Sequence, residues 1–257
     1  MQPIRNIFIV HQKGMEELVP CVEEAIKEMM DCFPQYKQYF PIKNLGDWKS
    51  ESNYIFKEGK FCLAPHESME WYLDRAKQKA KDEGRWQSRK QINVAQMYED
   101  LSNDPYAKKI PQWGIYLTMH DLYGGSASNF CLGVTKADAF SIISTKRFLD
   151  RHNQLNIDNF QTTVQHEFGH ILRLTEGDHP NIEESLGPHC TDPNCVMQQR
   201  LSGDMSDITE RRLLRKEQGL SPICSDCIIQ GKRTLFKLYA KHEKRFGPNT
   251  GDPNTGR

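Results

Sequence analysis

The sequence predicts an α/β fold in which a small twisted mixed sheet carries helices on its faces. Three short runs, residues 7–10, 113–119 and 139–144, have the apolar pattern and the β-branched and aromatic content of strands. Longer segments with apolar residues at three- and four-residue steps separate these runs, as expected for helices. We expect the strands and helices to form one layered domain that spans residues 1–246.

The first half of the chain supplies strands and helices in turn. The run at residues 7–10 leads into a helix that begins near Pro20, since proline suits the first helical turn. Residues 36–46 are expected to form an extended strand and a loop, and residues 67–81 a charged amphipathic helix. A further helix is predicted over residues 88–101.

The second half adds another strand, two helices and a polar tail. A strand is expected at residues 130–134, a charged helix at 206–218 and a C-terminal helix at 232–245. The C-terminal helix would dock through three of its residues, Leu235, Leu238 and Tyr239. Residues 247–257 contain no large apolar side chain and are expected to be disordered.

Charge and hydropathy limit the partners that the chain can have. Lysine plus arginine equals aspartate plus glutamate, 34 each, so no overall field favours nucleic acid or an anionic membrane. No apolar run approaches the roughly 20 residues needed to cross a bilayer. Residues 1–13 hold only a short apolar run, too short for a secretion signal. We therefore expect a cytoplasmic protein that binds neither nucleic acid nor membrane, and we expect a monomer.

The most informative stretch of the sequence is the pentapeptide HEFGH. On a helix, His166 and His170 project from one face and can bind one zinc ion. Glu167 lies beside them, placed to act as a general base. Asp158 could cap this helix, with Gln161 three residues on. The apolar stripe on the opposite side of the helix consists of Phe160, Val164, Phe168, Ile171 and Leu172. The alternative is a charged helix face that carries the pattern by chance, which the downstream residues disfavour.

The third ligand of such a site has several candidates. A catalytic zinc normally takes three protein ligands and keeps one position for water. His179 and His189 both follow a glycine by two residues, so local turn chemistry does not separate them. Glu183 and Glu184 are also available, although they follow His170 too closely for a second helix to return.

Four cysteines form two pairs with the spacing of a closed tetrahedral zinc site, Cys190-x4-Cys195 and Cys224-x2-Cys227. The alternative, a pair of disulfides, requires an oxidising compartment, for which the sequence gives no signal. A structural zinc ion is therefore favoured, and we expect residues 187–246 to be organised around it. The remaining cysteines lack paired spacing and are expected to be buried thiols: Cys21, Cys32, Cys62 and Cys131.

Together these residues resemble the archaemetzincin family of zinc peptidases, whose pattern is HExxHxxGxxHCxxxxCxM followed by CxxC. The resemblance implies a metzincin-like fold with the active-site helix under a cleft. It also implies two zinc ions, one catalytic and one structural. The catalytic ligands that it implies are His166, His170 and His189, with Glu167 as the general base. The structural ligands that it implies are Cys190, Cys195, Cys224 and Cys227, and Met197 would form the Met-turn beneath the catalytic ion.

The resemblance also indicates where a substrate would bind. In this family the strand before the motif helix lies at the rim of the cleft and pairs with the substrate backbone. Residues 139–144 occupy that place in this sequence. The substrate contacts that the resemblance implies are therefore Ala139, Phe140, Ser141 and Ile142.

The sequence departs from the family pattern after His170. Arg173 stands where the family has glycine, and Glu176 stands where it has the third histidine. An insertion of about 13 residues displaces the rest of the motif. Because the glycine lets the family's helix stop and the chain turn back, we expect the motif helix to continue here to about Thr175.

His189 is the expected third ligand, because it adjoins Cys190 and so ties one zinc site to the other, and His179 is the fallback. The expected activity is hydrolysis of peptide bonds in a peptide or protein substrate, with water activated by zinc and Glu167. The alternative is a zinc-stabilised peptide- or protein-binding module whose catalytic activity is impaired by the insertion.

Overall fold

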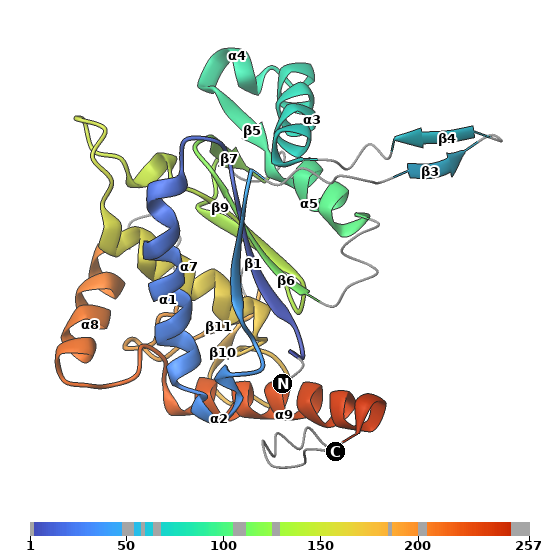
Figure 1. Cartoon of the computed structure of the whole chain (residues 1–257). Helices are drawn as coiled ribbons and strands as arrows, with labels where there is room; N and C mark the ends of the chain where they lie inside the picture. Colours follow the sequence, from blue (N-terminus) through green and yellow to red (C-terminus); the bar gives the residue numbers. More distant parts are fainter. Residues whose placement is uncertain are drawn as a thin grey trace.

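The computed structural model describes residues 3–47, 54–57, 60–63, 68–104, 112–124, 129–184, 187–199 and 205–247 (Figure 1). The strands are β1 Asn6–His11, β2 Ile42–Gly46, β3 Tyr54–Lys57, β4 Lys60–Leu63, β5 Gln91–Asn93, β6 Gln112–Thr118, β7 Asp121–Tyr123, β8 Gly133–Lys136, β9 Phe140–Ser144, β10 Ile182–Glu183 and β11 His189–Cys190. The α-helices are α1 Val19–Asp31, α2 Pro34–Lys37, α3 Met69–Asp82, α4 Arg85–Arg89, α5 Val94–Ser102, α7 Ile157–Ile171, α8 Ser206–Glu217 and α9 Ser225–Phe246. Two short 3-10 helices are η1 Glu16–Leu18 and η2 Lys146–Phe148.

A five-stranded sheet forms the centre of the molecule, with the strand order β2-β1-β6-β9-β8 (Figure 1). The first four strands run parallel, and β8 pairs antiparallel with β9 at one edge. The register places Ile7 opposite Trp113, and Gly114 opposite Phe140. The mixed α/β architecture expected from the sequence is therefore confirmed.

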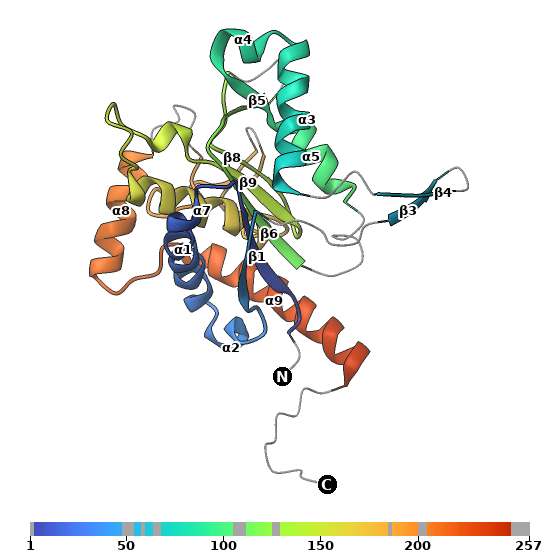
Figure 2. The ribbon, with the colours of Figure 1, turned by 45° about the horizontal axis from the view of Figure 1, so that its top comes forward.

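The sheet buries both of its faces, because successive side chains of a strand point to opposite sides. On one face, Ile7 and Ile9 of β1 belong to a core shared with α1 and α7. On the other face, Val10 and Tyr116 belong to a core shared with α3 and α5. Figures 1 and 2 show these two groups of helices on opposite sides of the sheet.

The motif helix α7 turns the expected apolar stripe toward the core. The stripe residues are all fully buried: Phe160, Val164, Phe168, Ile171 and Leu172. The helix is capped by Asn156, whose side chain accepts the Asn159 N–H at 3.0 Å, and not by Asp158 as expected. Asp158 lies in the first turn instead, where its negative charge suits the helix N-terminus.

The C-terminal end of α7 lies one turn earlier than the sequence indicated. Arg173 adopts the left-handed conformation, with φ 58°, that glycine usually provides. Its N–H bonds back to the carbonyl of His170 at 3.0 Å. The next N–H, that of Leu174, bonds to the carbonyl of Gly169 at 3.1 Å, which completes a Schellman motif. The expected extension of the helix is wrong, because Arg173 ends the helix in the way that glycine usually does. The left-handed conformation costs arginine about 1–2 kcal/mol.

The single helix expected over residues 88–101 is also wrong. α4 ends at Arg89, Lys90 takes a left-handed φ of 55°, and β5 then pairs with β7. Asn93 begins a new helix, α5, by accepting the Gln96 N–H at 3.0 Å. The helical periodicity of the sequence could not reveal this break, because β5 forms by pairing with a strand distant in sequence.

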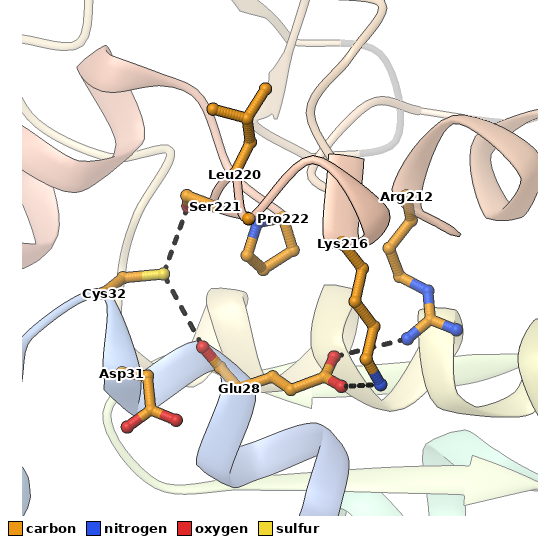
Figure 3. Close-up of a pocket in the computed structure, with 9 residues that line it drawn as sticks. Glu28, Asp31, Cys32, Arg212, Lys216, Leu220, Ser221 and Pro222 are labelled. Atoms are coloured by element: carbon orange, nitrogen blue, oxygen red, sulfur yellow. Dashed lines mark hydrogen bonds and ion pairs between the residues drawn. The ribbon is translucent and has the colours of Figure 1, made fainter. Parts of the chain in front are cut away.

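Ion pairs attach α8 to α1 beside a cavity of about 290 Å³ (Figure 3). The carboxylate of Glu28 lies 2.5 Å from Lys216 and 3.4 Å from Arg212. The thiol of Cys32 donates to the Glu28 carbonyl at 3.7 Å and lies 3.1 Å from the Ser221 hydroxyl. Burial raises the pKa of Cys32. Both cations of this cavity therefore face a carboxylate, and the thiol stays protonated and hydrogen-bonded.

The remaining expectations concern the unpaired cysteines, the C-terminal tail and membrane-spanning helices. The unpaired cysteines Cys21, Cys32 and Cys131 are free thiols, but they are half-buried rather than fully buried. The side chain of Cys62 and the tail from residue 248 onward lie outside the described residues. Among the described helices, none has a stretch both long enough and apolar enough to cross a membrane.

Candidate metal centres

Three histidine side chains meet where α7 passes the hairpin of β10 and β11. His166 and His170 come from the last turns of α7, and His189 comes from β11. The Nε2 atom of His170 lies 3.2 Å from that of His166 and 3.2 Å from that of His189. Two nitrogens that share one tetrahedral zinc at ~2.0–2.1 Å lie about 3.3 Å apart, so the spacing fits a single ion.

Hydrogen bonds orient two of these rings toward the shared centre. His166 Nδ1 donates to the carbonyl of Val196 at 2.7 Å, and His189 Nδ1 donates to the carbonyl of Gly187 at 2.9 Å. Because a carbonyl can only accept, Nδ1 carries the proton and Nε2 keeps a free lone pair. These partners therefore fix the tautomer that a metal ligand needs.

Burial keeps the three imidazoles neutral. It lowers the pKa of His166, and together with repulsion from the neighbouring rings it lowers that of His170 well below its ordinary value. Burial also lowers the pKa of His189 to about 4. Near neutral pH the three rings consequently offer lone pairs rather than positive charge, as metal binding requires.

Glu167 lies on the same helix and is directed toward β8, with 7% of the residue exposed. Its Oε2 accepts a hydrogen bond of 2.5 Å from the Thr135 hydroxyl, which itself lies 2.6 Å from the Ser141 hydroxyl. Burial raises the pKa of Glu167 to about 7, against the lowering effect of the Thr135 bond. A Cβ atom at Gly133 would come within 2.7 Å of the carboxylate, so Gly133 leaves the space that Glu167 occupies.

The sequence offers no signal for Thr135 or Gly133 as partners of the base. Nothing in their spacing relates them to Glu167, and only the position of β8 over α7 brings them there. Ser141 was expected near the site for a different reason, as a residue of the rim strand. Here its hydroxyl donates to the Glu167 carbonyl at 3.1 Å.

Met197 packs directly beneath the motif helix. It is fully buried, and its carbonyl accepts the N–H of Cys190 at 3.0 Å. A Cβ atom at Gly169 would lie 2.1 Å from the Met197 sulfur, so glycine at this helix position lets the sulfur approach the backbone. This arrangement places the Met197 sulfur against α7 at Gly169, next in sequence to His170, and the Met-turn role that the resemblance implies stays a prediction.

The four paired cysteines converge at a second centre inside the protein. The Sγ atoms of Cys190 and Cys224 lie 3.6 Å apart, and so do those of Cys195 and Cys227. Two sulfurs that share a tetrahedral zinc at ~2.3 Å lie about 3.8 Å apart, so the distance within each pair suits a shared ion. Ligand atoms of Cys190, Cys224, Cys227 and His179 also lie within 4.8 Å of one another. None of the four residues is more than 8% exposed. Hydrogen bonds from neighbouring thiols, that of Cys190 first, hold the pKa of Cys224 well below its usual range.

The two candidates for the third histidine ligand lie in different centres. His189 lies with His166 and His170. His179 is 7% exposed, and its Nε2 lies 3.3 Å from the sulfur of Cys227. The carboxylate candidates Glu183 and Glu184 are exposed.

The strand expected at the rim of the cleft lies inside the sheet instead. β9 pairs with β6 on one side and with β8 on the other, and all of its residues are buried. Sheet hydrogen bonds therefore occupy both edges of its backbone, so the expected substrate contacts at residues 139–142 need correction. The open edge belongs to β8, whose other side pairs with no strand in the part of the chain that the structure describes.

Comparison with known proteins identifies the fold. No protein-family model matches the sequence, and no curated protein matches it. The structure is similar to archaemetzincin from Methanopyrus kandleri, with a TM-score of 0.53 and 18% identity over 90% of this chain and 96% of that chain. Weaker similarities are to archaemetzincin from Archaeoglobus fulgidus (TM-score 0.47, 16% identity, 88% and 99% of the chains) and to a zinc-dependent peptidase from Methanocorpusculum labreanum (0.43, 14%, 88% and 98%). The archaemetzincin-like fold that the sequence motifs indicated is therefore confirmed.

Proposed function

We propose that this protein is a zinc-dependent peptidase whose catalytic ion is held by His166, His170 and His189. The observation that carries the proposal is the convergence of three imidazole nitrogens, all within 4.8 Å of one another, beside the buried carboxyl of Glu167. Three protein ligands leave one position of a tetrahedral zinc for water or substrate, which is the pattern of a catalytic site. The fold shared with archaemetzincin adds support.

The residues around the proposed zinc site would transfer the proton and hold the base in position. Zinc bound in such a site polarises a peptide carbonyl and makes water more acidic. Glu167 accepts the proton of the attacking water and passes it to the leaving amine, for which a pKa of about 7 is suitable near neutral pH. The Thr135 hydroxyl holds Oε2 of Glu167 in place during both transfers.

The substrate backbone would pair with β8. An extended peptide can add to the open edge of a sheet through main-chain hydrogen bonds. The edge of β8 is open among the described residues, and Thr135 on this strand contacts Glu167. A peptide bound along this edge therefore lies next to the proposed base.

The four cysteines would hold a second zinc ion with a structural role. Four thiolates fill every position of a tetrahedral zinc and leave none for substrate. Their burial and their free-thiol state in the structure are consistent with this role. Reduced thiols at such a centre also favour a reducing compartment, and we keep the cytoplasm as the proposed location.

Glu167→Gln tests the proposed function. The variant removes a proton acceptor but no ligand, so it should keep both metal ions and lose about 10²–10⁴-fold in peptidase activity. A library of fluorogenic peptides measures activity, and metal analysis shows that the ions remain. A variant with the activity of the parent would rule out Glu167 as the base.

The alternative is a zinc-stabilised binding module, and the same assay distinguishes it. A binding module would contain both ions, hydrolyse no peptide of the library, and bind peptides equally well with Glu167→Gln. A parent protein that takes up no metal at all would contradict both functions.

A further inference from the structure

Each sulfur of the cysteine centre has its own N–H donor. Backbone donors serve three sulfurs: Asp192 N–H to Cys190 at 3.4 Å, Cys224 N–H to Cys195 at 3.4 Å, and Cys227 N–H to Cys224 at 3.5 Å. The donor to the fourth sulfur, that of Cys227, is the side chain of His179, with Nε2 at 3.3 Å. Hydrogen bonds to a charged acceptor are stronger than neutral ones, so these four contacts stabilise the thiolate form.

A second hydrogen bond defines the role of His179. The backbone N–H of Asn181 lies 3.2 Å from His179 Nδ1. Because this N–H can only donate, Nδ1 must supply a lone pair, and in the neutral ring the proton then sits on Nε2. In this tautomer Nε2 has no lone pair for a metal. His179 is therefore a hydrogen-bond donor to Cys227 and not a metal ligand.

The contact also anchors the segment inserted after the motif helix. The side chain of Asn181 donates to the Asp226 carboxylate at 2.7 Å, in the first turn of α9. The following strand, β10, pairs with β11, which carries His189 and Cys190. The inserted segment thus contacts the cysteine centre from outside and supports the strand that links the two centres.

We propose that His179 is a positioning residue of the cysteine metal centre, where it donates a hydrogen bond from Nε2 to the metal-bound thiolate of Cys227. The inference rests on the proposed occupation of the four cysteines by a metal ion. Four thiolates around a divalent cation leave excess negative charge in a buried place, so a lost donor raises the free energy of the loaded site. Partners of this kind contribute about 10–100-fold to metal affinity, and we expect that range for His179.

Two substitutions of similar size test the hydrogen bond. His179→Gln keeps an N–H donor, whereas His179→Leu does not. The full-length variants are loaded with Co²⁺, whose thiolate charge-transfer absorption reports the cysteine centre alone, because the histidine centre has no sulfur ligand. His152→Leu, which changes an exposed histidine, is the matched control.

His179→Leu should lose cobalt to a chelator about 10–100 times faster than the parent. Its charge-transfer band should move to longer wavelength, because a thiolate that loses a hydrogen bond is oxidised more easily. His179→Gln and His152→Leu should remain close to the parent. A space-filling role for His179 predicts instead that leucine and glutamine behave alike.

Three results would overturn the inference. The first is a His179→Leu variant with the release rate and spectrum of the parent. The second is loss of the ion at the histidine centre with the cysteine centre unchanged. The third is a Cys195→Ser variant that keeps its cobalt while His179→Leu loses it, which would make His179 a direct ligand. A parent that binds no cobalt at its cysteines would refute the underlying proposal of a metal there, which distinguishes the two failures.

Discussion

The histidine centre and the cysteine centre lie beside each other but differ in how far they admit solvent. His166 and His170 are half-buried, whereas His189 and all four cysteines are at most 8% exposed. The first centre offers three nitrogen donors and the second four sulfur donors. An ion with three ligands can exchange water and substrate, and an ion with four thiolates cannot. The comparison agrees with the proposed division, in which the histidine centre is catalytic and the cysteine centre is structural.

The two centres also differ in how the chain assembles them. One helix supplies two of the three histidines, so much of the histidine centre exists once α7 forms. The cysteine centre takes ligands from around β11 and from the start of α9, and its His179 contact comes from the inserted segment. It therefore depends on tertiary structure and should be the more sensitive to loss of a single member.

Cys224→Ser should have the largest effect on stability. The variant loses one of four ligands, while the serine hydroxyl can still accept the Cys227 N–H at the start of α9, so the effect comes from the ligand. Metal content should fall by one ion, and the free energy of unfolding should fall by several kcal/mol, because a structural zinc contributes directly to folding. Cys32→Ser is the control, since this thiol lies outside both centres. A variant that is as stable as the parent and binds both ions would show that the cysteine centre is not a structural metal site.

His189→Ala should act directly on the histidine centre, and on the cysteine centre only through the coupling between the two. Only two imidazoles then remain to bind the catalytic ion. Loss of a residue that merely hydrogen-bonds to a ligand lowers metal affinity by up to about 100-fold, and loss of a ligand should lower it by more. The cobalt charge-transfer band of the cysteine centre should persist, and the thermal midpoint should change much less than in Cys224→Ser. Loss of both ions together would show that the two centres are one unit.

Thr135→Val should have a smaller effect, confined to catalysis. Valine has the shape of threonine but cannot donate to Glu167, so kcat should fall about tenfold or somewhat more, with metal content unchanged. Thr135→Ser keeps the hydroxyl and should retain most of the activity. Equal activity of the valine and serine variants would show that Glu167 does not need the hydrogen bond from residue 135.

Arg173→Gly should have the smallest effect, and it should be stabilising. Glycine relieves the left-handed strain at φ 58°, for a gain of about 0.5–1 kcal/mol in the free energy of unfolding. The exposed ion pair between Arg173 and Glu176 contributes little and offsets only part of this gain. Arg173→Ala removes the ion pair but keeps the strain. The free energy of unfolding measured in urea should therefore be highest for the glycine variant, and the alanine variant should be no more stable than the parent.

The sequence predicted the parts of the molecule that depend on local spacing. Two histidines four apart on a helix, and cysteines in two close pairs, are restricted by metal chemistry, and the folded chain brings each group together. The choice between His179 and His189 could not be made from turn chemistry. It depends on how the inserted segment packs on α9, through the contact of Asn181 with Asp226.

The errors concern features that no local pattern encodes. The sequence predicts β9 as the strand that pairs with substrate, but both of its edges are paired in the sheet, because strand order is a property of the whole fold. The sequence predicts a motif helix one turn too long, because arginine rarely adopts the left-handed conformation that ends the helix at this point. The partner of the base, Thr135, became visible only with β8 in position.

β11 gives one residue to each centre, and this sharing has a thermodynamic consequence. His189 and Cys190 are consecutive, so an ion at the cysteines fixes the backbone on which the third histidine stands. Part of the conformational entropy that His189 must lose on binding its own ion has then already been lost. Linkage makes the advantage reciprocal: each ion raises the affinity for the other by the same factor. Metal uptake by this chain should consequently be cooperative, so that a chain with one ion bound takes up the second at a lower free zinc concentration than a chain with none.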